Sequence, residues 1–313
     1  MSVRVQERFT VHSVQVLMST YNGEKYIKRQ IDSILDQQDV DIHLLIRDDG
    51  SKDSTSEIIR GYVEKYPKQV EVIMGNNLGY KKSFLTLIQL AGDYDYYAFA
   101  DQDDYWKPDK EIASIRKMEA DDFNGAKLAQ VNLEATDENL TPLNPPPHFR
   151  LLTIRKHDQV YSGDFFQGCL MTWNYAAMKI LKAYYPLGDH SHDHWVGKII
   201  YLLGQVYFVQ DKKICYSRHG DNTSTTDDRT GGRLLRLKSM FSGDKEVYDN
   251  IGADVLAGYS TLVSEHDRKI CEDLVNYKQD FFAKMRLLLN PDLSRPSLAG
   301  TIFFKLSLFL NRV

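Results

Sequence analysis

The feature that most constrains this fold is a repeat of short apolar runs, each followed by a polar loop and a helical pattern. Apolar runs at 14–18, 42–46 and 70–74 each precede residues whose apolar side chains recur at helical spacing, and a fourth run follows at 96–100. This alternation predicts βαβ units, a Rossmann-like α/β fold and a mostly parallel sheet flanked by helices. Ligands bind such sheets at the carboxyl ends of the strands. We therefore expect the polar loops that follow the strands to meet along one edge.

The second half of the chain is less regular. Further strands are expected at 127–133, 164–172, 206–210 and 213–216, and helices at 176–184 and 189–203. From about residue 228 onward the pattern is helical and amphipathic, without a new strand. We therefore predict two parts, a nucleotide-binding and catalytic domain over 1–227 and a C-terminal helical extension over 228–313.

Composition argues against several classes of protein. The 313 residues are 42% hydrophobic and 26% charged, as in a soluble globular protein. A net charge of −4 argues against a nucleic-acid binder, which would be strongly basic. The three cysteines form neither a disulfide framework nor a zinc motif, and the N-terminal residues lack the apolar core of a signal peptide. No stretch approaches the length of a membrane span, so we expect a cytoplasmic protein.

The fourth apolar run ends in clustered carboxylates, Asp101, Asp103 and Asp104, before Tyr105 and Trp106. Hard cations such as Mg²⁺ and Mn²⁺ take oxygen ligands, often one or two carboxylates together with substrate phosphates. A cation site at the edge of the sheet is therefore one interpretation. The other is an acidic turn in which Asp104 caps the next helix.

Short polar motifs follow the other strands as well. In chain order, these motifs are Met18-Ser19-Thr20-Tyr21-Asn22-Gly23, Asp48-Asp49-Gly50-Ser51 with Asp53, Asn77-Leu78-Gly79, Asp101-Gln102-Asp103-Asp104 with Trp106, Gly168-Cys169, His192-Asp193-His194-Trp195 and Arg218-His219-Gly220-Asp221-Asn222-Thr223. As an ordered set they resemble the bacterial family 2 glycosyltransferases with the GT-A fold, over roughly residues 12–225. The closest similarity is to the rhamnosyltransferase-like branch of cell-wall and capsule polysaccharide synthesis.

The resemblance implies a nucleoside-diphosphate sugar as donor. Thr20, Tyr21 and Asn22 would lie on the loop that holds the nucleobase, and Asp49 would accept a hydrogen bond from the base, with Asp48 supporting the loop. The remaining donor contacts implied by the resemblance are Asn77, Gly79, Lys82, Asp101 and His219. Asn77, Gly79 and Lys82 lie at a helix N-terminus, which favours anions, although a solvated lysine is an equally good interpretation of Lys82.

The resemblance also implies the chemistry of transfer. Asp103 would bind Mn²⁺ or Mg²⁺, and Asp101 would contact the ribose or reach the metal through water. Asp193 would be the general base, although its position fits a helix cap equally well. Gly168 and Cys169 would form the floor on the acceptor side, with Cys169 small and buried rather than catalytic.

These expectations together describe an inverting, metal-dependent glycosyltransferase. It would transfer a sugar to a hydroxyl of a growing cell-surface polysaccharide or lipid-linked glycan. The preferred donor is dTDP-rhamnose, which would supply L-rhamnose. A UDP-hexose donor is the alternative. A sugar nucleotidyltransferase is a weaker one, because 19–23 lacks a glycine-rich basic loop for a triphosphate. A non-catalytic sugar-binding module would not need both Asp103 and Asp193.

The C-terminal extension allows two interpretations. Its basic and apolar helices could lie on the inner face of an anionic membrane, where a lipid-linked acceptor would be met. They are equally expected to pack on the catalytic domain or on a second subunit, as in a homodimer.

Overall fold

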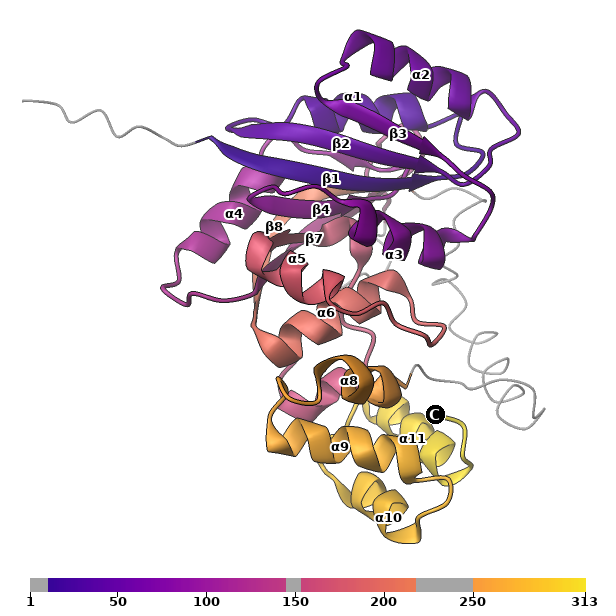
Figure 1. Ribbon diagram of the computed structural model, residues 1–313, viewed down its shortest axis with the longest axis vertical. Coiled ribbons are helices and arrows are strands. Elements are labelled where there is room, and N and C mark those ends of the chain that lie inside the picture. The colour runs from indigo at the N-terminus through magenta and orange to yellow at the C-terminus, as the bar shows by residue number, and fades with distance from the viewer. Residues whose placement is uncertain (1–10, 145–152, 218–249) are drawn as a thin grey trace, which may run out of the picture.

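The structure is a computed structural model that describes residues 11–144, 153–217 and 250–313 (Figure 1). Its centre is an eight-stranded mixed sheet in the order β3-β2-β1-β4-β7-β6-β8-β5. The strands are β1 (His12–Thr20), β2 (Val40–Asp48), β3 (Val70–Met74), β4 (Tyr96–Ala100), β5 (Tyr105–Trp106), β6 (Lys127–Thr136), β7 (Met171–Asn174) and β8 (Gln205–Ser217). The first four strands are parallel, whereas β7 runs antiparallel between β4 and β6.

Helices cover both faces of the sheet (Figure 1). On one face lie α1 (Ile27–Leu35), α2 (Thr55–Lys65) and α4 (Lys110–Glu119); on the other lie α3 (Tyr80–Leu90), α5 (Tyr175–Lys182) and α6 (His192–Leu203). In β1 the side chains of Val14, Val16 and Met18 join the first apolar layer, and Leu17 joins the second. Burial on both faces explains why the parallel strands read as continuous apolar runs.

The expected strands and helices of the first hundred residues are confirmed, with β3 and β4 at the predicted bounds. The strand expected at 164–172 is wrong for most of its length. Residues 168–170 form a short 3₁₀ helix, η2 (Gly168–Leu170), and only 171–174 pair with β4 and β6. The two strands expected at 206–210 and 213–216 are one strand, β8, which follows β6 through an irregularity in the register near Asn132.

Asp104 does not cap the next helix, so that expectation is also wrong. The N-cap of α4 is Asp109, because the two-residue strand β5 follows Asp104 and pairs with β8 before the helix begins. Asp104 is fully buried instead.

The C-terminal helices are α8 (Gly252–Tyr259), α9 (Glu265–Asn276), α10 (Phe281–Leu289) and α11 (Leu298–Phe309). They pack on α6 and on η1 (His157–Tyr161). Tyr259 of α8 lies 6.1 Å from the Trp195 ring, and His157 and Asp267 are 2.6 Å apart. The expected boundary at 227/228 lies outside the described residues, and one apolar cluster extends from the sheet into these helices. In the parts of the chain that the structure describes, none of the helices is both long enough and apolar enough to cross a membrane.

Candidate active site

The carboxyl ends of β1, β2 and β4 open onto a hollow of about 300 Å³. It is lined by Ser19, Thr20, Tyr21, Asp49, Asn77, Gly79, Tyr80, Phe84, Asp101, Gln102, Asp103 and Tyr216. Most residues selected from the sequence therefore lie around one space, as the parallel topology predicts. Asn22 and Lys82 are outside this lining, and both are exposed.

The loop after β1 is held by Gln102, which the sequence did not single out. Its side-chain oxygen accepts hydrogen bonds from the Thr20 hydroxyl at 2.6 Å and from the Tyr21 amide at 2.9 Å. Its amide nitrogen donates to the Tyr21 carbonyl at 3.2 Å. A residue between two aspartates of the acidic motif thus fixes the loop expected to hold the nucleobase. Its position in Asp101-Gln102-Asp103 was the only signal available.

The loop after β2 is built on its two aspartates. Asp48 accepts hydrogen bonds from Ser51 and Ser56, which makes it a support of the loop. Asp49 is buried, forms an ion pair with Arg47, and accepts hydrogen bonds from the backbone amides of Leu78 and Gly79, both at 2.8 Å.

Arg47 was not selected either, although a charged residue at the end of an apolar strand is a visible signal. Asp49 already accepts from Arg47 and from the amides of Leu78 and Gly79. A carboxylate can accept about four hydrogen bonds, so the N–H of a nucleobase would be its fourth donor.

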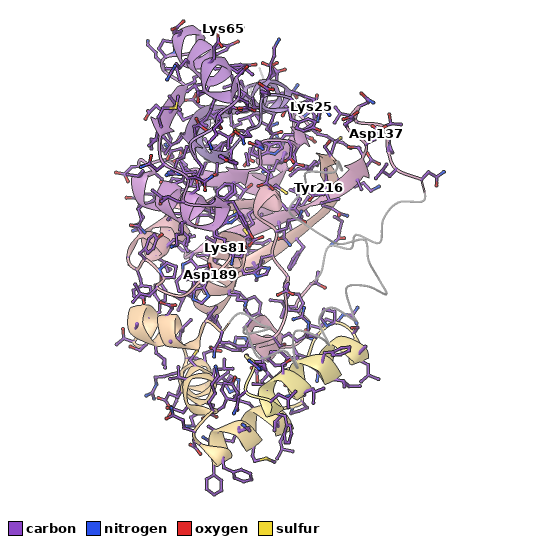
Figure 2. All side chains as sticks on the ribbon, turned by 90° about the vertical axis from the view of Figure 1, so that its right-hand side faces the viewer. Lys25, Lys65, Lys81, Asp137, Asp189 and Tyr216 are labelled. Carbon is purple, nitrogen blue, oxygen red and sulfur yellow. The ribbon has the colours of Figure 1, made fainter. Side chains whose placement is uncertain are left out.

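The loop after β3 approaches the hollow through Asn77 and Gly79. Gly79 is the N-cap of α3 and has a φ of 80°, a conformation that favours glycine. Lys81, rather than Lys82, makes a specific contact: its ammonium lies 3.0 Å from the carboxylate of Asp189. Figure 2 labels this pair.

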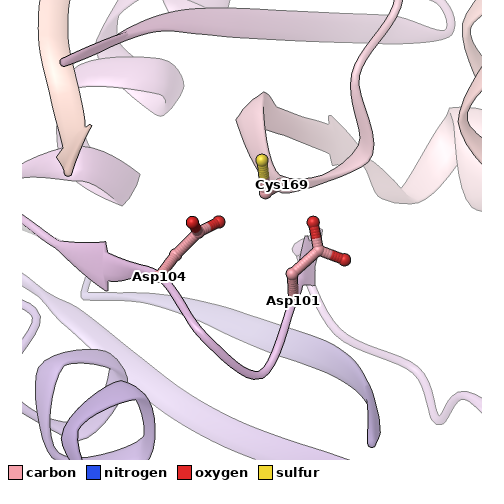
Figure 3. A group of neighbouring side chains, drawn as sticks. All are labelled: Asp101, Asp104 and Cys169. Atoms are coloured by element: carbon pink, nitrogen blue, oxygen red, sulfur yellow. The ribbon is translucent and has the colours of Figure 1, made fainter. Parts of the chain in front are cut away.

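The acid cluster, defined as Asp101, Asp103 and Asp104, begins where β4 ends. Asp101, Asp104 and the Cys169 thiol of η2 each place one potential ligand atom within 4.8 Å of the others, and Figure 3 shows the three side chains converging. Asp103 lines the hollow. Burial and the charges of Asp103 and Asp193 raise the pKa of Asp101 to about 7. Burial and the charges of Asp103 and Asp101 raise the pKa of Asp104 well above its usual value.

These residues fit a hard divalent cation. Both carboxylate oxygens of Asp104 are buried without a hydrogen-bond partner among the described residues, although the Cys169 thiol and the Ser217 amide lie nearby. Buried carboxylates without donors are costly unless a cation or a proton compensates them. Burial raises the pKa of Cys169 well above its usual value, so the thiol stays neutral and the set offers mainly oxygen ligands.

Asp193 lies in the first turn of α6, whose N-cap is Ser191. Its Oδ1 accepts hydrogen bonds from the Ser191 hydroxyl at 2.5 Å and from the His194 amide at 2.8 Å. Burial opposes its negative charge, but the electrostatic effect of His192 and His194 and these two hydrogen bonds lower its pKa below the usual value. Asp193 is therefore ionised at neutral pH and able to accept a proton.

Beside Asp193, His192 is buried with both ring nitrogens unpaired among the described residues. Its ring stacks on Phe84 at 4.0 Å, and burial lowers its pKa to about 4, so it is neutral at pH 7. A neutral imidazole offers one donor and one acceptor, and both await a partner here.

Gly168 joins the two halves of the site. A Cβ at this position would lie 2.7 Å from Nε2 of His192 and 3.6 Å from Cβ of Asp193. The next residue, Cys169, faces the acid cluster. The η2 turn therefore lies between the carboxylates of β4 and the start of α6. His219 and the rest of the Arg218–Thr223 motif lie outside the described residues.

Comparison with known proteins gives consistent results. The chain is 42% identical over 97 residues to a protein named dTDP-rhamnosyl transferase RfbG of Shigella flexneri, covering 30% of this chain and 34% of that one. It is 26% identical over 223 residues to the uncharacterized glycosyltransferase alr2836 of Nostoc sp., covering 67% of this chain and 66% of that one. The matches thus span about a third and just under two thirds of these relatives.

The fold also matches a solved structure. S. aureus TarS 1–349 in complex with UDP-GlcNAc superposes with a TM-score of 0.56 and 14% identity, covering 93% of this chain and 78% of that one. This similarity confirms the fold expected from the sequence, GT-A with C-terminal helices. The model of the family described as "Glycosyl transferase family 2" matches residues 15–174, about half of the chain. The chain therefore belongs to glycosyl transferase family 2.

Proposed function

We propose that this protein is an inverting, metal-dependent glycosyltransferase that uses a nucleoside-diphosphate sugar. The observation that carries the proposal is the pairing of two sets of carboxylates across the η2 turn. The acid cluster lies on one side, at the hollow, and the ionised Asp193 lies on the other. A transferase of this kind needs one group of residues for the leaving diphosphate and a separate base for the attacking hydroxyl.

Asp101, Asp103 and Asp104 are the residues that would hold Mn²⁺ or Mg²⁺. The cation would neutralise the charge that develops on the leaving diphosphate. The unpaired oxygens of Asp104 and the raised pKa of Asp101 support this assignment, because both indicate carboxylates assembled without a compensating charge among the described residues. Asp103 remains the first candidate for direct contact because it lines the hollow.

The donor nucleotide would bind in the hollow beside the cluster. Thr20 and Tyr21, fixed by Gln102, would hold the nucleobase, and Asp49 would accept its N–H. Asn77 and Gly79 would meet the donor at the start of α3. Asn22 and Lys82 stay proposed donor contacts that would need to approach when the donor binds. His219, outside the described residues, also stays a proposed donor contact. The UDP-GlcNAc complex of the structurally similar TarS supports a nucleoside-diphosphate sugar.

Asp193 would act as the general base. As the acceptor hydroxyl oxygen forms its bond to the anomeric carbon, Asp193 takes the hydroxyl proton, and the bond from that carbon to the diphosphate oxygen breaks. The electron pair leaves with the diphosphate, so one displacement inverts the anomeric centre and no covalent enzyme intermediate forms. The neutral His192 beside Asp193 supplies a donor and an acceptor for the acceptor sugar.

The proposed donor is dTDP-L-rhamnose, and the acceptor a hydroxyl of a growing surface polysaccharide or lipid-linked glycan. The 42% identity to the Shigella flexneri dTDP-rhamnosyl transferase RfbG supports this choice over a UDP-hexose. That match covers only part of both chains, so the UDP-hexose alternative is included in the test.

A donor-binding experiment with an Asp193→Asn variant tests the proposal. We expect dTDP-rhamnose with Mn²⁺ to raise the melting temperature of both proteins equally, because asparagine keeps the Oδ1 acceptor for Ser191 and His194. Enzymatic release of dTDP should fall by roughly 10²- to 10⁴-fold in the variant, since only the base is lost. Stabilisation by UDP-glucose or UDP-galactose alone would select the alternative donor. Wild-type turnover in EDTA, or full turnover by Asp193→Asn, would refute the mechanism.

A further inference from the structure

The C-terminal end of the molecule carries an apolar surface that the proposed chemistry does not use. We call it the end face, and its exposed members are Phe281, Phe282, Leu289, Leu298, Ile302 and Phe309. It belongs to α10 and α11, which lie at the end of the molecule opposite α2 (Figure 1). Large apolar side chains scattered singly on a surface are normal, but a group of six on two adjacent helices marks an interaction site.

Helix α11 is apolar on both its inner and outer sides. Phe304 and Leu308 are fully buried against the other helices. Leu298, Ile302 and Phe309, at spacings of four and seven residues, form a stripe on the outer side with exposures of 79%, 57% and 62%. A helix that only covered the core would carry polar residues on that side. The outer stripe therefore needs an explanation beyond folding.

The outer side of α10 continues the same surface. Phe282 and Leu289 are 71% and 72% exposed. The two helices are fixed side by side, because the ammonium of Lys305 donates hydrogen bonds to the carbonyls of Leu287 at 2.6 Å and Asn290 at 2.8 Å. The Lys284 ammonium is also 3.4 Å from the carbonyl of Phe309. The end face is thus one rigid surface rather than two independent helices.

The charge around this surface identifies its partner. Residues 276–313 contain six basic side chains, Lys278, Lys284, Arg286, Arg295, Lys305 and Arg312, and two acidic ones, Asp280 and Asp292. Arg286 and Arg295 form ion pairs with Asp273 and Asp164 outside the segment, and Asp292 forms one with Lys156. The segment and these three partners together are therefore positive by three, in a chain whose net charge is −4. Exposed apolar side chains on a segment of net positive charge fit a surface that offers both hydrocarbon and negative charge.

We propose that the end face docks on the surface of an anionic lipid membrane. A second copy of the chain fits less well, because a twofold dimer would place the same basic surface against itself. The apolar side chains would enter the headgroup boundary. Lys278, Lys284 and Arg312 would meet the phosphates, whereas Arg286, Arg295 and Lys305 are bonded within the protein. Helices of nine and twelve residues suit this arrangement, which lies on the membrane and does not cross it. The proposal does not depend on the identity of the donor sugar.

Vesicle sedimentation tests the proposal with a matched control. We expect the full-length protein to sediment with phosphatidylglycerol-containing vesicles, more weakly with pure phosphatidylcholine, and less as salt is raised. The triple variant Leu298→Ser, Ile302→Ser, Phe309→Ser should lose roughly a hundredfold or more in partitioning, since three large apolar contacts are removed. Leu187→Ser should bind normally, because Leu187 is 86% exposed but lies before α6 and is not part of the end face.

Two further measurements keep the test decisive. The melting temperature of the triple variant must match the wild type, because a partly unfolded protein would itself lose membrane binding; single serine substitutions replace it if it does not. Light scattering after size exclusion measures the oligomeric state. Absence of wild-type binding to anionic vesicles overturns the proposal, and so does a wild-type dimer that the triple variant converts to monomer. Equal binding by the wild type and the triple variant also overturns it.

Discussion

Asp104→Asn should stabilise the metal-free protein while weakening its response to divalent cations. Asp104 is fully buried, and two further aspartates of the cluster lie beside it. The nearby Cys169 thiol and Ser217 amide lower its pKa by less than burial and these charges raise it. The folded, metal-free protein therefore holds a proton on this carboxyl at a pH where the unfolded chain has released it. Asparagine has nearly the same shape and no proton to hold.

The size and sign of the effect follow from this difference in proton binding. The pKa of Asp104 in the folded protein lies well above the unfolded value of 3.8. The contribution of this carboxyl to the free energy of unfolding is therefore fully present below pH 3.8 and is lost as the pH rises toward the folded pKa. Each pH unit costs about 1.4 kcal/mol, which gives at most about 4 kcal/mol at pH 7. We expect Asp104→Asn to be more stable than the wild type at pH 7, by no more than about 4 kcal/mol, and nearly equal to it at about pH 4.

Urea unfolding followed by tryptophan fluorescence measures these free energies, first in EDTA and then with Mn²⁺. The cation should raise the stability of the wild type more than that of the variant, because it replaces the proton on the buried carboxylate. Asp122→Asn, an exposed aspartate outside the cluster, is the matched control and should change little. A variant that is less stable than the wild type in EDTA at pH 7 would refute the reasoning, because it would show that Asp104 has a stabilising partner.

Two other substitutions test how the site is positioned. Gln102→Ala leaves the buried Thr20 hydroxyl without its acceptor, at a cost of about 1–3 kcal/mol, so the KM for the donor should rise about tenfold in steady-state assays. Gln89→Ala, at an exposed position, is the control and should have no effect. An unchanged KM in Gln102→Ala would contradict this role. Gly168→Ala places a Cβ 2.7 Å from His192 Nε2, so kcat should fall by roughly ten- to a hundredfold and thermal unfolding should occur at a lower temperature. Gly61→Ala, with no heavy atom within 4 Å of the new Cβ, is its control, and equal kcat values for the two variants would contradict the expected shift of α6.

The parts of the site that could be predicted from sequence are those that depend on local patterns. The runs 70–74 and 96–100 are bounded by polar residues and agree with β3 and β4. Parallel topology then requires the loops after β1, β2 and β4 to meet, as they do at the hollow. No long-range contact had to be known for this step, because the repeated βα pattern implies the direction of each strand.

The parts that were missed depend on contacts between distant residues. Residues 168–170 read as part of a strand, since their apolar character fits one. The structure turns them into η2 instead, which brings Cys169 to Asp104, a residue 65 positions earlier. The role of Gln102 depends on the loop at 20–21, and that of Lys81 on Asp189. Pattern and propensity describe neighbours along the chain and do not identify these partners.

The charges around the hollow bear on the order of binding. No lysine or arginine is among its described lining residues, whereas three aspartates are. A nucleoside diphosphate is itself an anion, and two like charges in a partly buried site repel by several kcal/mol at close range. Arg47 offsets the charge of Asp49, its partner in a buried ion pair, so the repulsion comes from Asp101 and Asp103 of the acid cluster. The described site therefore favours a donor that arrives with its cation, or after it, over a free donor. On this reasoning, a chelator should abolish donor binding itself, not only the chemical step.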